Sequence, residues 1–266
     1  GNWGYSLAAE AFDTNGYISS FNPTSPPQPG PVDEPVASKY QTGVLNIERK
    51  IGTNVRAYSG FVYSNEARNN GTPLTRNDTQ FRQANIGADF THRYGRTSIQ
   101  AYGGSEGFDS TFSSVTAGRR TESLFSTQHV PLGYGGIQGT TLFSLGPHSI
   151  VAGMDFRNAR GISNEIQFRN NAVSGRIKNG GSQQTYAPFI EDVIAVTSRA
   201  NVSWSLRWDH WRNLDIAGTR AVESRWSPKV GATYRINSNV GLHDAGYGAF
   251  RARTLNELYR TLSVGN

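Results

Sequence analysis

Alternation of apolar and polar residues limits the fold of this chain more than any other feature. Between Ala200 and Asp209, the residues Ala, Val, Trp, Leu and Trp alternate with Asn, Ser, Ser, Arg and Asp. A period of two places the two sets on opposite faces of a β-strand. The same pattern recurs along the chain, and we find no convincing three-turn helix with apolar residues at helical spacing. The sequence therefore predicts an all-β protein.

Eleven strands are expected, separated by segments rich in Gly, Asn, Ser and Pro. They cover residues 2–12, 39–51, 55–64, 79–93, 96–106, 122–145, 150–156, 182–197 and 200–211, followed by two strands that begin at 227 and 240. Residues 122–145 are interpreted as one strand with an irregularity at Pro131. The Pro-rich stretch 23–35 is interpreted as a surface loop, although a polyproline recognition segment is the alternative.

The predicted connections alternate in length along the chain. Short turns are expected near 52, 95, 146, 198 and 238, and long loops after 12, 63, 108, 157 and 211. Turns at one end of a sheet and long loops at the other are typical of outer-membrane barrels. An up-and-down antiparallel sheet is therefore predicted, and its eleven strands form an odd, unclosed set.

A transmembrane β-barrel is favoured over a soluble β-sandwich, which alternates in the same way. Charged side chains occupy the polar face in mid-strand, and aromatic side chains lie near the predicted strand ends, where interface girdles belong. The charged set is Arg56, Asp89, Asp155 and Arg207, and the aromatic set is Trp3, Tyr94, Trp208 and Trp211. No apolar run reaches the roughly 18 to 20 residues of a membrane helix, so any membrane span must be a closed barrel.

The sequence predicts no catalytic, cofactor-binding or metal-binding residues, and the protein is not expected to be an enzyme. Cysteine is absent, and the net charge of +6 is spread over single residues, which disfavours nucleic-acid binding. The glycines at 133–139 lack the Lys and helix of a phosphate loop. Asp209, His210 and His243 lack metal-ligand spacing. Adjacent Glu191 and Asp192 point to opposite strand faces.

Several short segments of the sequence resemble motifs of the TonB-dependent outer-membrane receptors. They include KYQTGVLNIERKIG, RNNGTPLTRNDT, QHVP at 128–131, SPKVGATYR at 227–235, and FRA and TLNELYR at 250–252 and 254–260. In that family the segments that correspond to FRA and TLNELYR end a strand at the outer rim of the barrel. Arg253 stands where the family usually has Pro, and Asp244 falls on the face of Val240 and Leu242, the expected lipid face. A position near a rim, a bulge or a degraded copy would each account for Asp244.

The resemblance implies a bacterial outer-membrane receptor that takes up a scarce solute, such as a ferric siderophore. Its expected partners are membrane lipid, the siderophore or another small-molecule ligand, and the TonB complex acting through a plug domain. Large plugged transporters have about 22 strands, so residues 1–266 are expected to be a partial barrel without plug or terminal strands. The residues that bind the ligand remain unknown from sequence. The alternatives are a passive porin-like channel and a soluble β-sheet module that binds a ligand.

Overall fold

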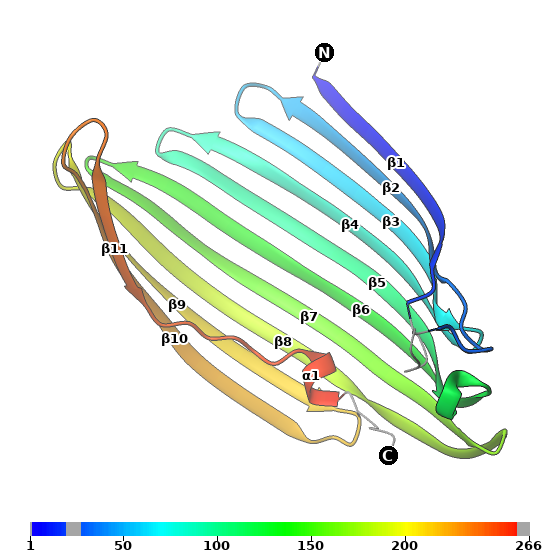
Figure 1. The fold of residues 1–266 in the computed structure, drawn as a ribbon. Coiled ribbons are helices and arrows are strands. Elements are labelled where there is room, and N and C mark those ends of the chain that lie inside the picture. The colour runs from blue at the N-terminus through cyan, green and yellow to red at the C-terminus, as the bar shows by residue number, and fades with distance from the viewer. Residues whose placement is uncertain (1, 20–27, 260–266) are drawn as a thin grey trace.

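The computed structural model describes residues 2–19 and 28–259, and most of these residues form one β-sheet (Figure 1). Its strands are β1 (Trp3–Tyr17), β2 (Val36–Ile51), β3 (Val55–Thr72), β4 (Thr75–His92), β5 (Gly95–Val115), β6 (Glu122–Leu145), β7 (His148–Arg169), β8 (Ala172–Ala195), β9 (Ala200–Asp215), β10 (Arg220–Arg235) and β11 (Gly241–Tyr247). A 3-10 turn, η1 (Ala117–Arg119), lies between β5 and β6, and a short helix, α1 (Leu255–Tyr259), follows β11.

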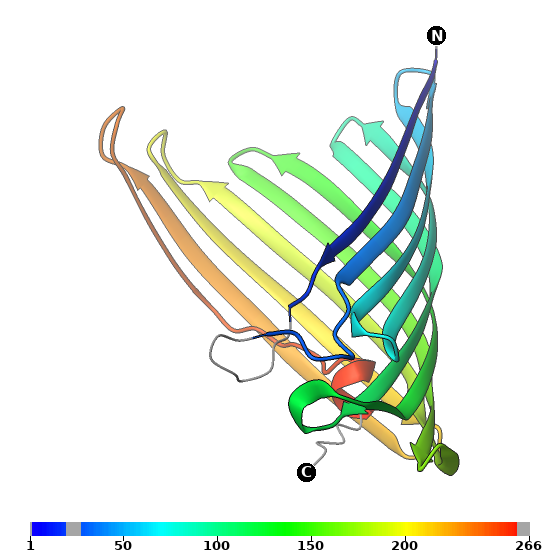
Figure 2. The same ribbon diagram turned by 45° about the vertical axis from the view of Figure 1, so that its right-hand side comes forward.

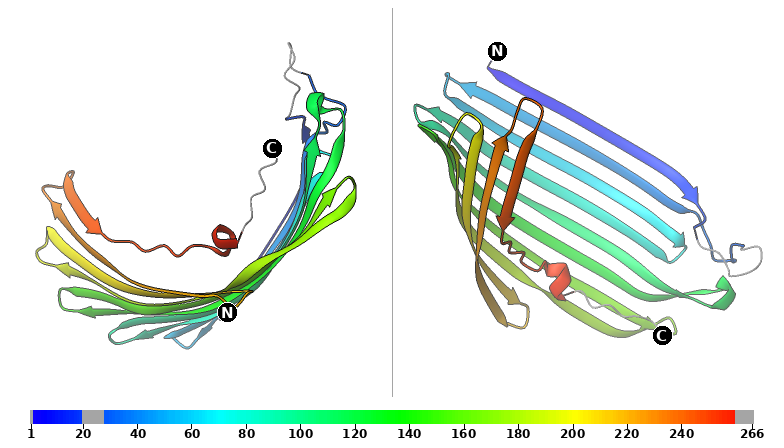
Figure 3. Two further views of the ribbon diagram at one scale, coloured as in Figure 1. Left: turned by 90° about the horizontal axis from the view of Figure 1, so that it is seen from below. Right: turned by 60° about the vertical axis from the view of Figure 1, so that its left-hand side comes forward.

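The strands pair in sequence order from β1 to β11, and each pair is antiparallel. The predicted all-β class and the eleven-strand up-and-down order are confirmed. The sheet is open, because β1 and β11 lie at its two edges. It is curved into a trough, with a convex outer face and a concave inner face (Figures 2 and 3).

The predicted long loops are mostly wrong, because the strands run further than expected. Residues 65–77 and 157–181 belong to β3, β4, β7 and β8, apart from two-residue turns at 73–74 and 170–171. Similarly, β5 extends to Val115, and only 216–219 separates β9 from β10. Asn170 and Asn171 both have positive φ, at 51° and 61°, as a type I′ hairpin turn requires. The polar residues of these segments indicated exposure to solvent, which was interpreted as a loop. In the structure, the same polar segments remain hydrogen-bonded to the neighbouring strands.

The connection between β1 and β2 remains long, as predicted. Residues 20–27 of its Pro-rich stretch lie outside the described part of the chain. The described remainder is fixed by an ion pair of 2.5 Å between Arg119 Nε, in η1, and the buried carboxylate of Asp33. This connection and η1 lie at the same end of the sheet.

Strand β6 is continuous from Glu122 to Leu145, which confirms its interpretation as one strand. Its irregularity lies elsewhere than predicted, since the register with β5 shifts opposite Phe112 and Ser113, around residue 125. Pro131 pairs with Gly107 without any shift. Proline lacks an N–H group and so weakens one ladder position, but pairing with β7 keeps its register on both sides of Pro131.

The two faces of the sheet differ strongly in polarity. Apolar side chains cover the middle of the outer face and are more than one third exposed; this apolar band includes Leu7, Leu45, Phe61, Ile86, Ile99, Ile137, Met154, Ile190, Leu206 and Val230. Among the described residues, only Ala187 and Trp211 are buried apolar residues. A soluble sandwich would bury one face of each sheet in a shared core, so this sheet requires an apolar environment on its outer face.

Two rim features follow from the register. Trp3 lies on the outer face at the start of β1, as predicted for an aromatic girdle, and Tyr94 lies in the turn between β4 and β5. Trp208 also lies on the outer face, but it falls in the middle of β9 because this strand continues to Asp215, so its predicted position near a strand end is wrong. The described residues contain no helix with the length and hydrophobicity that a membrane span requires.

Candidate functional site

The inner face carries charged side chains that pair across neighbouring strands. Arg56 Nη1 lies 3.1 Å from Asp89 Oδ2, and Arg96 Nη2 lies 2.5 Å from the same oxygen. Arg56 also contacts Glu48 of β2 at 2.7 Å. The predicted position of Arg56 and Asp89 on the polar face is confirmed. The carboxylate of Asp89 is only 9% exposed, so the two arginines replace the water that it loses.

A second charge network lies on β7 and β9. Arg207 contacts Asp155 at 2.8 Å and Asp209 at 3.0 Å. Ala187 of β8 pairs with Asp155 and is fully buried, so the long arginine spans a strand that carries only a methyl group there. The alternation indicated that Asp155 and Arg207 share a face, but it gave no information on which side chains meet.

The chain after β11 crosses the concave face (Figure 3). We call residues 248–259 the inner strap. Gln183 Nε2 donates a hydrogen bond of 3.0 Å to the carbonyl of Arg253, and the side-chain amide of Asn213 donates to the hydroxyl of Tyr259. Gly181 leaves room for this contact, because a Cβ there would lie 2.8 Å from Tyr259 Oη and 2.5 Å from the Leu214 carbonyl oxygen. The strap is therefore seated on β8 and β9.

Helix α1 within the strap corrects the prediction that TLNELYR ends a strand at the outer rim. Thr254 Oγ1 accepts a hydrogen bond from the Glu257 amide at 3.2 Å, and Glu257 Oε2 accepts one from the Thr254 amide at 2.8 Å. This is a capping box, which the spacing T-x-x-E encodes and which could have been found in the sequence. Hydrogen bonds from Arg251 and then from the Thr254 amide lower the pKa of Glu257 to about 2.

A cavity of about 690 Å³ lies between the inner strap and the sheet. Its lining combines aromatic, cationic and acidic residues of the sheet with residues of the strap; those that matter for binding are Glu106, Phe108, Phe112, Arg157, Trp211, Arg253 and Tyr259. Trp211 was predicted to belong to an aromatic girdle, and this prediction is wrong. Trp211 follows Arg207 and Asp209 at intervals of two residues along β9, so its side chain lies with theirs on the inner face. Its buried indole Nε1–H has no hydrogen-bond partner among the described residues.

The residues considered from sequence as possible metal-binding, phosphate-binding or acid–base groups lie within regular β-strands. Asp209 is engaged by Arg207, and His210 Nδ1 lies 2.7 Å from Ser224 Oγ. Glu191 and Asp192 lie on opposite faces, as predicted. The glycines of 133–139 lie within β6. The described residues contain no group of three or more His, Cys, Asp or Glu side chains able to hold a metal ion.

Asp244 lies on the outer face, as predicted. It pairs with Ala232 in a ladder that runs without a shift from Lys229 and Tyr247 to Arg235 and Gly241. A bulge therefore does not explain its position. Its side chain is exposed, and its carboxylate accepts a hydrogen bond from the adjacent Ala245 amide at 2.9 Å.

The fold is similar to those of solved outer-membrane receptors, at sequence identities that establish the fold alone. The open form of the ferric-catecholate import receptor Fiu from E. coli K12 has a TM-score of 0.71 at 10% identity, and the match covers 92% of this chain and 50% of that one. The ferripyoverdine receptor of Pseudomonas aeruginosa gives 0.72 at 12% identity, with 92% and 38% covered. The ferric yersiniabactin uptake receptor FyuA from Yersinia pestis gives 0.67 at 11% identity, with 91% and 41% covered.

The chain thus spans half or less of the length of these structures. No curated protein matches it in sequence. A family model described as TonB dependent receptor-like, beta-barrel, matches residues 3–266, which is almost the whole chain. The resemblance of short sequence segments to this family is therefore confirmed over residues 3–266. This chain belongs to the TonB-dependent receptor β-barrel family.

Proposed function

We propose that this chain forms part of the barrel wall of a bacterial outer-membrane receptor that actively takes up a scarce solute such as a ferric siderophore. Membership of the receptor family and the apolar outer face support placement in the outer membrane. Several structures of similar fold are, by their titles, import or uptake receptors for ferric ligands. Energy would reach the receptor through TonB, and the protein would act as a transporter with no catalytic residues.

The eleven strands are proposed to be one part of a larger barrel that also contains a plug and further strands. Two observations support this. The matched share of the similar structures is between 38% and 50%, and large plugged transporters have about 22 strands. The outer edges of β1 and β11 would pair with those further strands, since unpaired edges template aggregation.

The cavity beneath the inner strap is the observation that carries the proposal of ligand binding. Arg157 and Arg253 outnumber the one acidic residue of the lining, Glu106, and Phe108, Trp211 and Tyr259 supply aromatic surface. Such a lining suits an anionic ligand with flat apolar parts, because guanidinium groups bind oxyanions and aromatic rings stack. The strap also obstructs the inner face, which favours a receptor over a passive channel.

The experiment uses the full-length receptor in cells and measures accumulation of iron-labelled siderophores. We expect uptake to require TonB and the proton-motive force, and Arg157→Gln to raise the ligand concentration for half-maximal uptake about tenfold, which corresponds to about 1.4 kcal/mol. Lys50→Gln is the matched control, because Lys50 is a cation on the same face far from the cavity. Uptake that continues without TonB would support the passive channel, and an unchanged Arg157→Gln variant would exclude this cavity as the binding site.

A further inference from the structure

The inner strap lies on a flat floor of the inner face. Gly161 of β7 and Gly181 of β8 are direct cross-strand partners, so neither strand projects a side chain there. A Cβ on Gly161 would lie 3.5 Å from Leu255 Cδ1, and one on Gly181 would lie 2.8 Å from Tyr259 Oη. Leu255 and Tyr259 are the first and last residues of α1 and share one face of the helix. This face of α1 therefore rests on the two glycines.

Two amide side chains beside the glycines hold the strap. Gln183 of β8 and Asn213 of β9 are direct cross-strand partners. Gln183 donates to the carbonyl of Arg253 at 3.0 Å, and Asn213 donates to the hydroxyl of Tyr259. Each of these hydrogen bonds joins two neutral groups, and its net contribution is small because water or another polar partner can replace it. A ligand that offers such a group can therefore compete with the strap.

The strap also carries hydrogen bonds of its own. Arg251 donates to the two carboxylate oxygens of Glu257 at 2.7 and 3.1 Å, and the capping box joins Thr254 to Glu257. The Leu258 amide donates to the Thr254 carbonyl at 3.1 Å. These contacts lie within the strap, so they persist when it leaves the sheet. The strap can therefore separate from β8 and β9 as one unit.

The seat of Tyr259 on the sheet is only partly satisfied. Asn213 is 7% exposed, and its Nδ2 donates to the Tyr259 hydroxyl. Its buried Oδ1 has no hydrogen-bond partner among the residues that the structure describes. Buried polar groups are normally paired, because an unpaired one loses its water without compensation. Tyr259 thus engages the donor half of this amide and leaves the acceptor half unused. A phenol that is not tied to the strap can donate its O–H to that acceptor.

The cavity of about 690 Å³ continues from this seat. Phe108 of β5 and Trp211 of β9 line it together with Tyr259. The first two rings belong to the sheet and stay in place when the strap separates, whereas the ring of Tyr259 leaves with the strap. The sheet therefore retains aromatic surface next to a vacated phenol seat.

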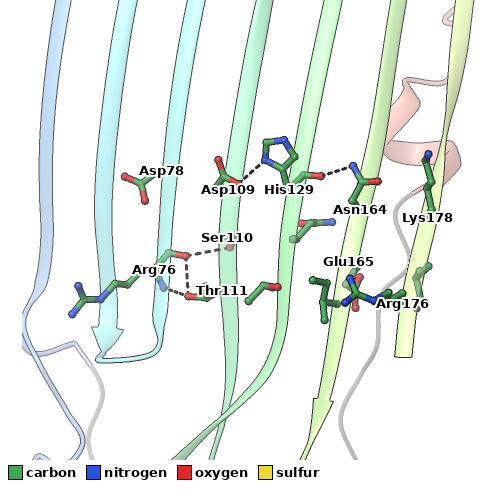
Figure 4. Close-up of a pocket in the computed structure, with 14 residues that line it drawn as sticks. Arg76, Asp78, Asp109, Ser110, Thr111, His129, Asn164, Glu165, Arg176 and Lys178 are labelled. Atoms are coloured by element: carbon green, nitrogen blue, oxygen red, sulfur yellow. Dashed lines mark hydrogen bonds and ion pairs between the residues drawn. The ribbon is translucent and has the colours of Figure 1, made fainter. Parts of the chain in front are cut away.

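A cavity of about 460 Å³ on the outer face differs in kind (Figure 4). Arg76 lines one side, and Arg176 and Lys178 line the other. Its lining, within the described part of the chain, includes no Phe, Tyr or Trp. Such a lining offers a phenol no aromatic surface on which to pack. Selective binding of a phenol is therefore expected in the inner cavity and not on the outer face.

We propose that the inner strap is an internal competitor of the ligand, in which Tyr259 occupies a seat for a phenol ring. A ligand with a free aryl hydroxyl group places that hydroxyl on Asn213 and its ring over Gly181, and the strap separates from β8 and β9. The inference rests on the proposed function, because it concerns the same cavity. It adds the ligand class, a molecule with a free aryl hydroxyl group, and it predicts that the strap opposes binding.

The test measures binding of two soluble probes to the full-length receptor in detergent micelles by saturation-transfer NMR. N-acetyl-tyrosinamide carries a phenol, and N-acetyl-phenylalaninamide differs from it only by the missing hydroxyl. The variant Tyr259→Phe keeps the ring of the strap but loses its hydrogen bond with Asn213. Because a weaker competitor leaves more of the binding-competent form, we expect this variant to bind N-acetyl-tyrosinamide about fivefold more tightly than the wild type, which corresponds to about 1 kcal/mol.

Tyr247→Phe is the matched control, because Tyr247 lies at the end of β11, is 74% exposed and stands outside the cavity lining. It should bind both probes as the wild type does, with a preference for N-acetyl-tyrosinamide. Asn213→Ala removes the amide that receives the hydroxyl, so it should bind the two probes equally.

Unchanged or weaker binding of N-acetyl-tyrosinamide by Tyr259→Phe would show that Tyr259 is a wall of the cavity rather than a competitor, and would overturn the proposal. Equal binding of the two probes by the wild type, or a hydroxyl preference that persists in Asn213→Ala, would overturn it too. A heat-dependent gel shift reports folding of each variant, and Tyr259→Phe alone decides the question if Asn213→Ala does not fold.

Siderophore uptake is measured in parallel to separate this inference from the proposed function. Uptake that depends on TonB and on Arg157, with no tightening in Tyr259→Phe, refutes the internal competitor alone. Tightening in Tyr259→Phe, with uptake that continues without TonB, refutes the proposed function alone.

Discussion

Removal of the Asp89 side chain tests the inner-face charge network most directly. The carboxylate is 9% exposed, and it accepts contacts from Arg56 at 3.1 Å and Arg96 at 2.5 Å. A hydrogen bond to a charged group contributes about 1.5–3 kcal/mol. The two arginine side chains are 44% and 54% exposed, so water replaces part of each contact, and the loss falls to about 1 kcal/mol per arginine. We expect Asp89→Ala to lower the free energy of unfolding by about 2 kcal/mol.

The assay is urea unfolding of the full-length receptor in lipid vesicles, followed by tryptophan fluorescence. Asp13→Ala is the matched control, because Asp13 also pairs across strands, with Lys39 at 3.4 Å, but both side chains are more than 60% exposed. It should produce no measurable change. In an Arg96→Gln background, the effect of Asp89→Ala should fall by about half. Equal effects of Asp89→Ala and Asp13→Ala, or full additivity with Arg96→Gln, would refute the reasoning.

Three further outcomes are expected in the full-length receptor. Ala187→Leu should destabilise the folded barrel by about 1–3 kcal/mol in the same urea assay, because Ala187 is fully buried on the strand that Arg207 crosses to reach Asp155; an unchanged midpoint would contradict this packing. Thr254→Ala should remove the capping box and weaken α1 by about 1 kcal/mol, so hydrogen exchange of the α1 amides should accelerate, whereas Asn256→Ala should leave it unchanged. The pKa of Glu257 is lowered from 4.5 to about 2, so its stabilisation of the strap should be complete above about pH 4.5 and lost as the pH falls through about 2, which exchange measured across that range would show or disprove.

The sequence by itself determined which residues share a face and how many strands follow one another. Alternation is a local property, so the polar-face position of Arg56, Asp89, Asp155 and Arg207 could be assigned before any pairing was known. The all-β class, the strand order and the resemblance to the receptor family followed from the same local signals. The end of the apolar–polar alternation did not mark the ends of the strands. Residues 65–77 are mostly polar, but apart from the turn at 73–74 they remain paired in β3 and β4.

Tertiary structure alone decided which side chains meet. The contact of Arg207 with Asp155 depends on the register of three strands and on the small size of Ala187 between them. Trp211 was assigned to the wrong face by its position near a strand end. The inner strap illustrates both cases: its helix start was encoded locally by Thr254 and Glu257, but its seat on the inner face depends on distant residues of β8 and β9. Local patterns fix the direction of a side chain, whereas its partners are set by chain segments far away in sequence.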